Sequence, residues 1–311
     1  MRARKLGGLK SSKRKRLIFY ICLLAYPLAH YAVFYIGVNI NSVLLAFKKF
    51  DGGEFSFLEA SNFFANFSNF SGDLFKTSLL KYAAKNSLLM YGVSLLIVLP
   101  LNLMFSFFLY KKIPLKGFYR IVLFLPQIVS SIVMAMMFKY FVERGLPGLF
   151  SKFNIELPTL LTDVKTAFST IIAYNIWAGF GTQIIIYSGA MSRISEELVE
   201  SGKLDGMNMF QEFIRITLPL IYPTVSLFLV AGVAGIFTSQ AALYNFFGDE
   251  AQANVSTLGY FLFVRVIGKS STFNDYPYAA AAGLLFTAAA LPITLGAKYL
   301  LDRFDPMRDA I

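Results

Sequence analysis

Few residues in this chain have side chains that could carry out catalysis or hold a metal. The 311 residues include one histidine, His30, and one cysteine, Cys22, both in the first apolar run. A single pair of such ligands is too few for a zinc site, and a lone cysteine cannot form an intramolecular disulfide. The central parts of the last five apolar segments carry no charged side chain. No catalytic constellation can be assembled, which argues against a membrane-embedded enzyme.

A nucleotide site is also not predicted. Gly268-Lys269-Ser270 resembles the end of a phosphate-binding loop, but Phe263 stands where the first glycine of that loop is required. We therefore expect no bound cofactor.

The most distinctive polar segment is a short island between two long apolar runs. It carries three glutamates, two small residues and an Asp-Gly pair, and a proline closes it. These residues are Glu196, Glu197, Glu200, Ser201, Gly202, Asp205, Gly206 and Pro219. The structural alternative is an ordinary amphipathic connector between two membrane helices.

The order of residues in this island predicts two short helices joined by a tight turn. Ser195 can cap the first helix, whose opening acids favour the positive end of the helix dipole. Asp205-Gly206 is typical of a turn, with Gly206 free to adopt positive φ. Asn208 and Gln211 have the spacing of a capping pair for the second helix. Pro219 is then expected near the first turn of the next apolar helix.

A second set of residues is polar or aromatic but uncharged and lies within the apolar segments. Amide groups and aromatic rings together suit a neutral polyol, and glycines leave room beside a ligand. The predicted pathway residues are Asn175, Trp177, Gly179, Thr182, Gln183, Gly232, Gly235, Ser239 and Tyr244. The alternative is that these residues only join helix to helix.

The composition places all these residues in a membrane protein. Hydrophobic residues make up 56% and charged residues 15%, where a soluble domain has about 25% charged residues. The mean hydropathy is +0.59. Six apolar windows are long enough to span a bilayer. They cover about 17–40, 86–110, 118–142, 167–191, 217–243 and 276–301.

The apolar stretch from Val255 to Ile267 is too short to span and is expected to lie on the outer membrane surface.

Basic residues predict the orientation of these helices. The first sixteen residues hold eight Lys or Arg and no acid, and segments assigned to the inside hold 18 of the 29 basic residues. This distribution favours both termini inside, and explains the net charge of +11 without nucleic acid. The predicted parts are a cytoplasmic tail (1–16), a first transmembrane helix (17–45), an extracytoplasmic loop (46–81), a five-helix core (82–302) with a cytoplasmic loop at 191–218, and a cytoplasmic tail (303–311).

The polar island resembles the "EAA" loop of ATP-binding-cassette (ABC) import permeases. That loop has Glu, two small residues, a Gly four positions later, then Ile-x-Leu-Pro; here Ser201-Gly202 stands in place of the usual Ala-Ala. The resemblance covers about residues 82–302 and is closest to the carbohydrate group. It also rests on Asn86-Ser87-Leu88, Phe118-Tyr119-Arg120, Leu125-Pro126 and Trp177-Ala178-Gly179-Phe180.

The resemblance implies an all-α polytopic protein with six transmembrane helices, the type I importer permease fold, in a bacterial cytoplasmic (inner) membrane. Its family works with a second homologous permease, giving a heterodimer here, two cytoplasmic ATPase subunits that bind the ATP, and an extracytoplasmic solute-binding protein. The cargo it implies is a carbohydrate, and the 191–218 loop is where the ATPase docks. The alternatives are another polar solute such as a glycerol phosphate compound, which would favour a basic cavity, and a secondary transporter or channel, which would place charges in the spans.

Overall fold

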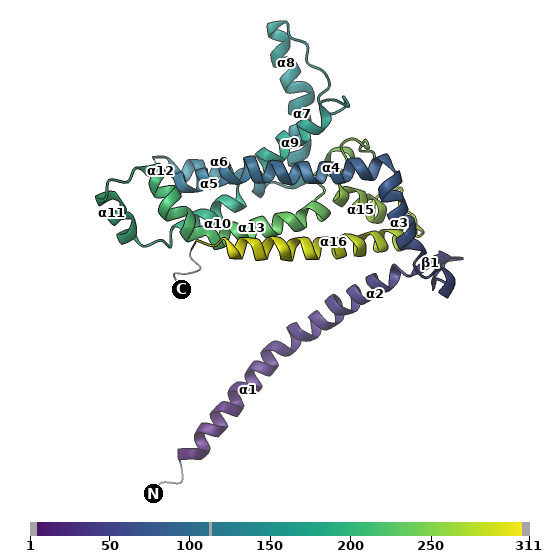
Figure 1. Cartoon of the computed structure of the whole chain (residues 1–311), viewed down its shortest axis with the longest axis horizontal. Helices are drawn as coiled ribbons and strands as arrows, with labels where there is room; N and C mark the ends of the chain where they lie inside the picture. The colour runs from purple at the N-terminus through teal and green to yellow at the C-terminus, as the bar shows by residue number, and fades with distance from the viewer. Residues whose placement is uncertain (1–4, 112–113, 307–311) are drawn as a thin grey trace.

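The computed structural model describes residues 5–111 and 114–306, with side chains described from Arg14 onward. This part of the chain is almost entirely helical (Figure 1). Its strands are β1 (Lys48–Asp51) and β2 (Glu54–Phe57), which pair antiparallel in a hairpin. The rest of the predicted tails, 1–4 and 307–311, lies outside the described residues.

Within the described residues four helices are long and apolar enough to cross a membrane, and each overlaps a predicted window. Three of them contain a π-helical turn that continues the helix. They are Arg14–Leu45 (within α1, Lys5–His30; η1, Tyr31–Gly37; α2, Val38–Leu45), Ser78–Tyr110 (α4, Ser78–Val93; η3, Ser94–Val98; α5, Leu99–Tyr110), Met209–Thr238 (α12, Met209–Glu212; η6, Phe213–Thr217; α13, Leu218–Thr238) and Asp275–Arg303 (α16).

The third predicted window does not form one straight helix. α6 (Lys116–Ile128) and the helix that starts at Ser131 meet at an angle of 101°. Pro126 lies in the last turn of α6 and has no N–H to donate, and Val129 then adopts an extended backbone. Beyond the break the chain continues as α7 (Ser131–Tyr140), η4 (Phe141–Gly145), α8 (Leu146–Phe150) and η5 (Ser151–Phe153).

The fourth window is also interrupted, between α9 (Ala167–Ala178) and α10 (Thr182–Met191). Gly181 has φ +116°, and a Cβ there would lie 2.5 Å from Cγ of Gln127. Glycine is the residue that adopts this conformation without strain. The described chain therefore holds four candidate spans, or five if the bent pair is one, so the helical class is confirmed and the six-helix count is not.

The core of the body is formed where these helices run alongside one another. α5 packs along α10, and α13 packs along α16. The two-helix loop of α11 (Glu196–Leu204) and α12 lies at the same end of the body as the last turns of α16, while α3 (Ala65–Lys76) and the hairpin lie at the opposite end (Figure 1).

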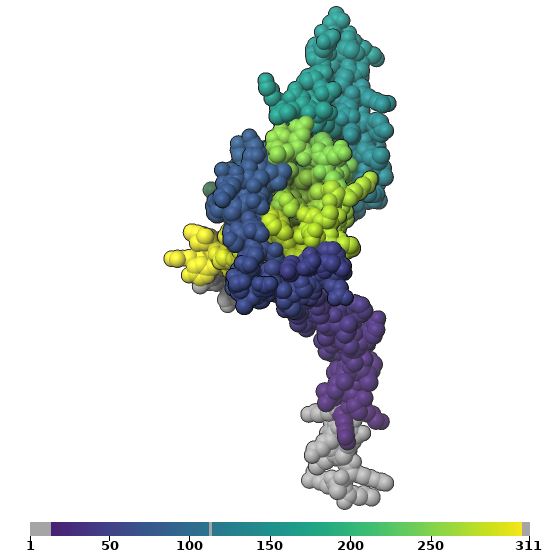
Figure 2. Space-filling view, turned by 90° about the vertical axis from the view of Figure 1, so that its right-hand side faces the viewer, coloured from purple at the N-terminus to yellow at the C-terminus, as the bar shows by residue number. Residues whose placement is uncertain are grey.

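Two apolar arms project from this body on opposite sides (Figures 1 and 2). None of the apolar window of Arg14–Leu45 is buried. The α7–α8 arm exposes Met137, Tyr140 and Phe153 by 60%, 57% and 76%. Large exposed apolar surfaces of this kind are covered by lipid or by another chain.

The predicted surface helix forms as α15 (Leu258–Ile267), but its first turn is buried, from Leu258 to Phe261. This half of the helix packs against the body, and its place at the outer membrane surface stays a prediction. Oη of Tyr260 donates to the carbonyl of Gly248 at 2.7 Å and accepts from the N–H of Ala251 at 3.1 Å. Burial raises the pKa of the Tyr260 phenol, which keeps it protonated as a donor.

Candidate functional site: a two-helix loop and an uncharged cavity

The 191–218 loop has the local structure that its sequence predicts. Oγ of Ser195 accepts from the N–H of Glu197 at 3.3 Å and caps α11. Gly206 makes the turn with φ +77°. Asn208 and Gln211 form a reciprocal capping box at the start of α12, with both hydrogen bonds at 2.9 Å. The loop is therefore a defined helical hairpin.

The outer face of this hairpin is open. Glu196, Glu197, Glu200 and Ser201 are exposed, and so is Asp205. Large apolar side chains lie among these polar groups: Leu204 is 89% exposed and Phe210 72%. A mixed polar and apolar surface of this kind suits docking to another protein.

Gly202 faces the interior of the hairpin. It is buried, and a Cβ at this position would overlap Cε of Met207 and lie 2.9 Å from Cδ1 of Ile216. The space beside Gly202 is therefore filled by the chain's own Met207, in the turn, and Ile216, in η6. Pro219 lies in the first turn of α13, as predicted.

A buried ion pair joins this hairpin to the body. Nζ of Lys111, directly after α5, binds Oε1 of Glu212, the last residue of α12. The two side chains are 19% and 6% exposed. Nζ of Lys111 also lies 5.5 Å from the ring centroids of both Phe107 and Tyr110.

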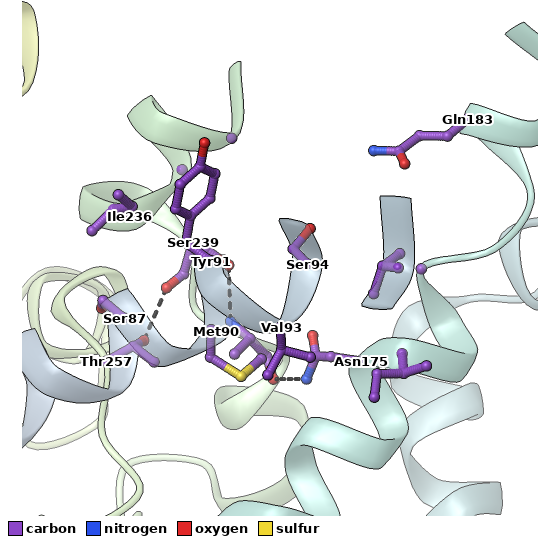
Figure 3. Close-up of a pocket in the computed structure, with 16 residues that line it drawn as sticks. Ser87, Met90, Tyr91, Val93, Ser94, Asn175, Gln183, Ile236, Ser239 and Thr257 are labelled. Atoms are coloured by element: carbon purple, nitrogen blue, oxygen red, sulfur yellow. Dashed lines mark hydrogen bonds between the residues drawn. The ribbon is translucent and has the colours of Figure 1, made fainter. Parts of the chain in front are cut away.

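A partly open cavity of about 230 Å³ lies between α4, α9, α13 and the start of α10 (Figure 3). Figure 3 shows Gln183 and Tyr91 on opposite sides of the open space, with Ser94 between them. The lining residues are Ser87, Met90, Tyr91, Val93, Ser94, Val98, Asn175, Ile176, Gly179, Gln183, Gly232, Gly235, Ile236, Ser239, Ala241 and Thr257. None of them is ionisable at neutral pH, so the cavity offers hydroxyl, amide and aromatic groups.

Hydrogen bonds fix the polar groups of this wall. Nδ2 of Asn175 donates to the carbonyl of Ala241 at 3.1 Å, and Oγ1 of Thr257 donates to the carbonyl of Ser239 at 2.9 Å. On the other side, Oε1 of Gln183 accepts from Nδ2 of Asn102 at 2.7 Å. Within the described chain Nε2 of Gln183 donates no hydrogen bond, so it stays free for a ligand.

Six of the nine predicted pathway residues line this cavity: Asn175, Gly179, Gln183, Gly232, Gly235 and Ser239. Three do not. Trp177 stacks on Phe138 with centroids 6.1 Å apart. Thr182 is exposed, with its hydroxyl 3.5 Å from Oε1 of Gln127. Tyr244 packs on Phe263 and lines a separate outer crevice.

The sequence analysis missed the wall that α4 and η3 provide. Ser87, Tyr91, Ser94 and Val98 recur at spacings of four, three and four, which puts them on one helix face. That polar stripe in an apolar segment was the available signal. Tyr91 and Ser94 also line a smaller inner cavity of about 130 Å³, together with Gln183 and Gly232.

Comparison with known proteins gives concordant results. A family described as "Binding-protein-dependent transport system inner membrane component" matches residues 98–308. The arabinooligosaccharides transport system permease protein of Bacillus subtilis is 23% identical over 85% of this chain and 82% of its own length. A probable ABC transporter permease protein of Mycoplasma genitalium is 30% identical, over 58% and 57%. The maltose/maltodextrin permease protein of Klebsiella aerogenes is 30% identical, over 61% and 39%, so the chain spans well under two thirds of some relatives.

Solved structures share the fold. A chain of a bacterial alginate ABC transporter, solved in complex with an alginate pentasaccharide-bound periplasmic protein, superposes with a TM-score of 0.75. The match covers 96% of this chain and 98% of that chain at 22% identity. A second structure of a bacterial alginate importer gives a TM-score of 0.74.

Proposed function

Since the chain belongs to the binding-protein-dependent transport system inner membrane component family, we propose that it forms half of the channel of an ABC importer for a neutral oligosaccharide. It is a transport component of a membrane, not an enzyme. Relatives named for arabinooligosaccharides and maltodextrins support a carbohydrate cargo.

The uncharged cavity is the observation that carries the cargo assignment. Its lining offers the amide of Gln183, the hydroxyl of Ser94 and the ring of Tyr91 around one space. Neutral sugars bind through such polar groups combined with an apolar wall. Asn175, Gly179, Gly232, Gly235 and Ser239 complete the proposed pathway. Trp177, Thr182 and Tyr244 lie outside the cavity, and contact with the sugar at these positions would require a different conformation.

The same cavity disfavours the competing cargo. A phosphorylated solute favours basic partners, and no Lys or Arg lines the cavity. A secondary transporter would need ionisable groups there, and the described lining has none. The described lining therefore favours neither a phosphorylated solute nor ion-coupled transport.

The proposed assembly contains this chain, a second related permease, two cytoplasmic ATPase subunits and an extracytoplasmic binding protein. The exposed face of the α11–α12 hairpin supports ATPase docking, because acidic Glu200 and apolar Leu204 lie open beside each other. The two projecting arms support a permease partner. ATP would bind to the ATPase subunits.

The proposed topology has both termini inside and six crossings, in a bacterial inner membrane. The hairpin and the last turns of α16 lie at one end of the body (Figure 1), and the eight basic residues of the first sixteen favour the inside. The two interrupted windows, α6–α7 and α9–α10, would supply the third and fourth crossings.

Copurification tests the docking surface. Membranes are gently solubilised and the chain is captured with its partners, for wild type, Glu200→Lys and Leu204→Arg. We expect an ATPase and a second permease with wild type and loss of the ATPase alone from both variants. Glu59→Lys is the control, because Glu59 is exposed and follows the β1–β2 hairpin, at the end of the body opposite to α11 and α12. Capture of the wild-type chain alone would contradict the proposal.

Uptake into proteoliposomes that contain the complete assembly tests the cargo. Radiolabelled arabinotriose and maltotriose are supplied with the binding protein, with and without ATP inside. ATP-dependent uptake of either sugar supports the proposal. Uptake of neither, in an assembly whose ATPase responds to its loaded binding protein, would overturn the neutral oligosaccharide.

A further inference from the structure

The ion pair between Lys111 and Glu212 joins the loop to the helix that lines the cavity. Glu212 ends α12, the second helix of the hairpin, and Lys111 follows α5 directly. Glu212 is 4% exposed as a residue, although the surrounding loop is largely open. A charge buried to this degree needs its partner.

Other contacts reinforce this junction. The ring of Phe213, the residue after Glu212, packs on Phe107 of α5 with centroids 5.0 Å apart. Phe107 and Tyr110 flank the ammonium group of Lys111 on the α5 side. The ammonium thus sits between two rings and a carboxylate, which restricts movement of α12 relative to α5.

The helix that ends at this junction reaches the cavity without a break. Ser78–Tyr110 is continuous through the π-helical turn Ser94–Val98. Ser87, Tyr91 and Ser94 project from the same helix into the cavity wall. A displacement of its cytoplasmic end must therefore move this wall.

The same helix holds α10, which carries Gln183. Nδ2 of Asn102 donates to Oε1 of Gln183 at 2.7 Å, and Oγ of Ser106 donates to the carbonyl of Ile184 at 3.2 Å. Asn102 and Ser106 are each 0% exposed. These bonds tie α5 to α10, so both sides of the cavity are linked to the junction at Lys111.

We propose that the Lys111–Glu212 ion pair is the joint through which movement of the docked hairpin reaches the cavity. Both are positioning residues, because they contact neither sugar nor nucleotide. The inference rests on the proposed function, since it requires an ATPase that moves the hairpin. It adds a defined path, from Glu212 through Lys111 to the walls that carry Tyr91 and Gln183.

The test compares sugar transported with ATP hydrolysed in the complete assembly in proteoliposomes. Glu212→Gln and Lys111→Met each break the pair. We expect hydrolysis stimulated by the loaded binding protein to persist and the ratio of sugar transported to ATP hydrolysed to fall about tenfold. The charge swap Lys111→Glu with Glu212→Lys should regain most of the ratio.

The control is an ion pair at the opposite end of the body. Arg265 and Asp275 lie 3.1 Å apart and link α15 to α16. Asp275→Asn is expected to lower thermal stability and leave the ratio unchanged. A general loss of stability therefore cannot account for a lowered ratio in Glu212→Gln alone.

Single variants that assemble and keep the wild-type ratio would overturn the inference. If they fail to assemble, the double variant Lys111→Met with Glu212→Leu, which leaves no unpaired charge, replaces them: a lowered ratio supports the joint and a wild-type ratio rejects it. Failure of the proposed function looks different, because wild type itself would then transport neither arabinotriose nor maltotriose.

Discussion

At the scale of single residues, the position of Tyr91 depends on the absence of a side chain at Gly232. A Cβ on Gly232 would lie 2.8 Å from Cε2 of Tyr91. Tyr91 Oη donates to the carbonyl of Leu229 at 3.3 Å. The ring lines both the cavity of about 230 Å³ and the smaller one of about 130 Å³. Its position therefore decides how far the two cavities are connected.

Gly232→Ala should therefore displace the ring of Tyr91 and reduce sugar uptake. Overpacking of this kind costs about 1–3 kcal/mol, and we expect the effect in the maximal uptake rate more than in thermal stability. Uptake kinetics in proteoliposomes provide the measurement. Gly283→Ala in α16, whose added Cβ meets nothing within 4 Å, is the control. Equal rates for the two variants would show that the ring does not limit passage.

At the scale of elements, the sequence predicts local structure well and the course of the spans less well. Ser195, Asn208 and Gly206 act as predicted because capping and positive φ depend on neighbours in sequence. The breaks at Val129 and Gly181 were missed because hydropathy averages over a window and does not record a backbone angle. By hydropathy alone, an apolar segment that contains Pro126 or Gly181 is still predicted to be one continuous helix.

The cavity shows the same limit. Asn175, Gly179 and Gln183, three of the predicted pathway residues, recur every four residues and line the same cavity despite the break in the backbone. Trp177 points to an aromatic cluster, and Tyr244 belongs to a separate short helix, α14 (Leu243–Phe247). Which side of a helix faces a cavity depends on how the helices pack, and this packing cannot be predicted from the composition of one helix.

The α11–α12 hairpin is one packed element, so filling its interior should destabilise it. Gly202→Val would force Met207 and Ile216 apart, and we expect a loss of about 1–3 kcal/mol with a lower melting temperature of the solubilised assembly. Ser201→Val is the control, since Ser201 is exposed. Adding Met207→Ala should recover stability in the Gly202→Val background. Destabilisation that Met207→Ala does not relieve would mean that the contact is not the cause.

At the scale of the whole molecule, the body is packed and the arms are not. Buried side chains concentrate in clusters between α4, α5, α9, α10, α13, α15 and α16. The side chains of α1 described from Arg14 onward are exposed without exception. Exposed apolar arms of this kind are covered by lipid or by another chain.

Cys22, the single cysteine, reports whether α1 is covered. It is exposed in the isolated chain. We expect a membrane-permeant maleimide to label it readily in the solubilised subunit and several-fold more slowly in the complete assembly. The comparison for reagent access is Ser56→Cys in a Cys22→Ser background, because Ser56 is exposed on the β1–β2 hairpin. Equal labelling of Cys22 in both preparations would show that α1 faces lipid.

The helix Arg14–Leu45 has 32 residues, which at 1.5 Å each is roughly 48 Å, against a hydrocarbon core of about 30 Å. The excess length is accommodated by tilt, or by extension of the basic residues Arg14 to Arg16 into the headgroup region. Its C-terminal end is held by the contact of α2 with α16, and the rest of the helix is free to tilt with the thickness of the lipid around it. Acyl-chain length thereby sets where the inner end of α1 comes to rest, and with it the sideways reach of the molecule.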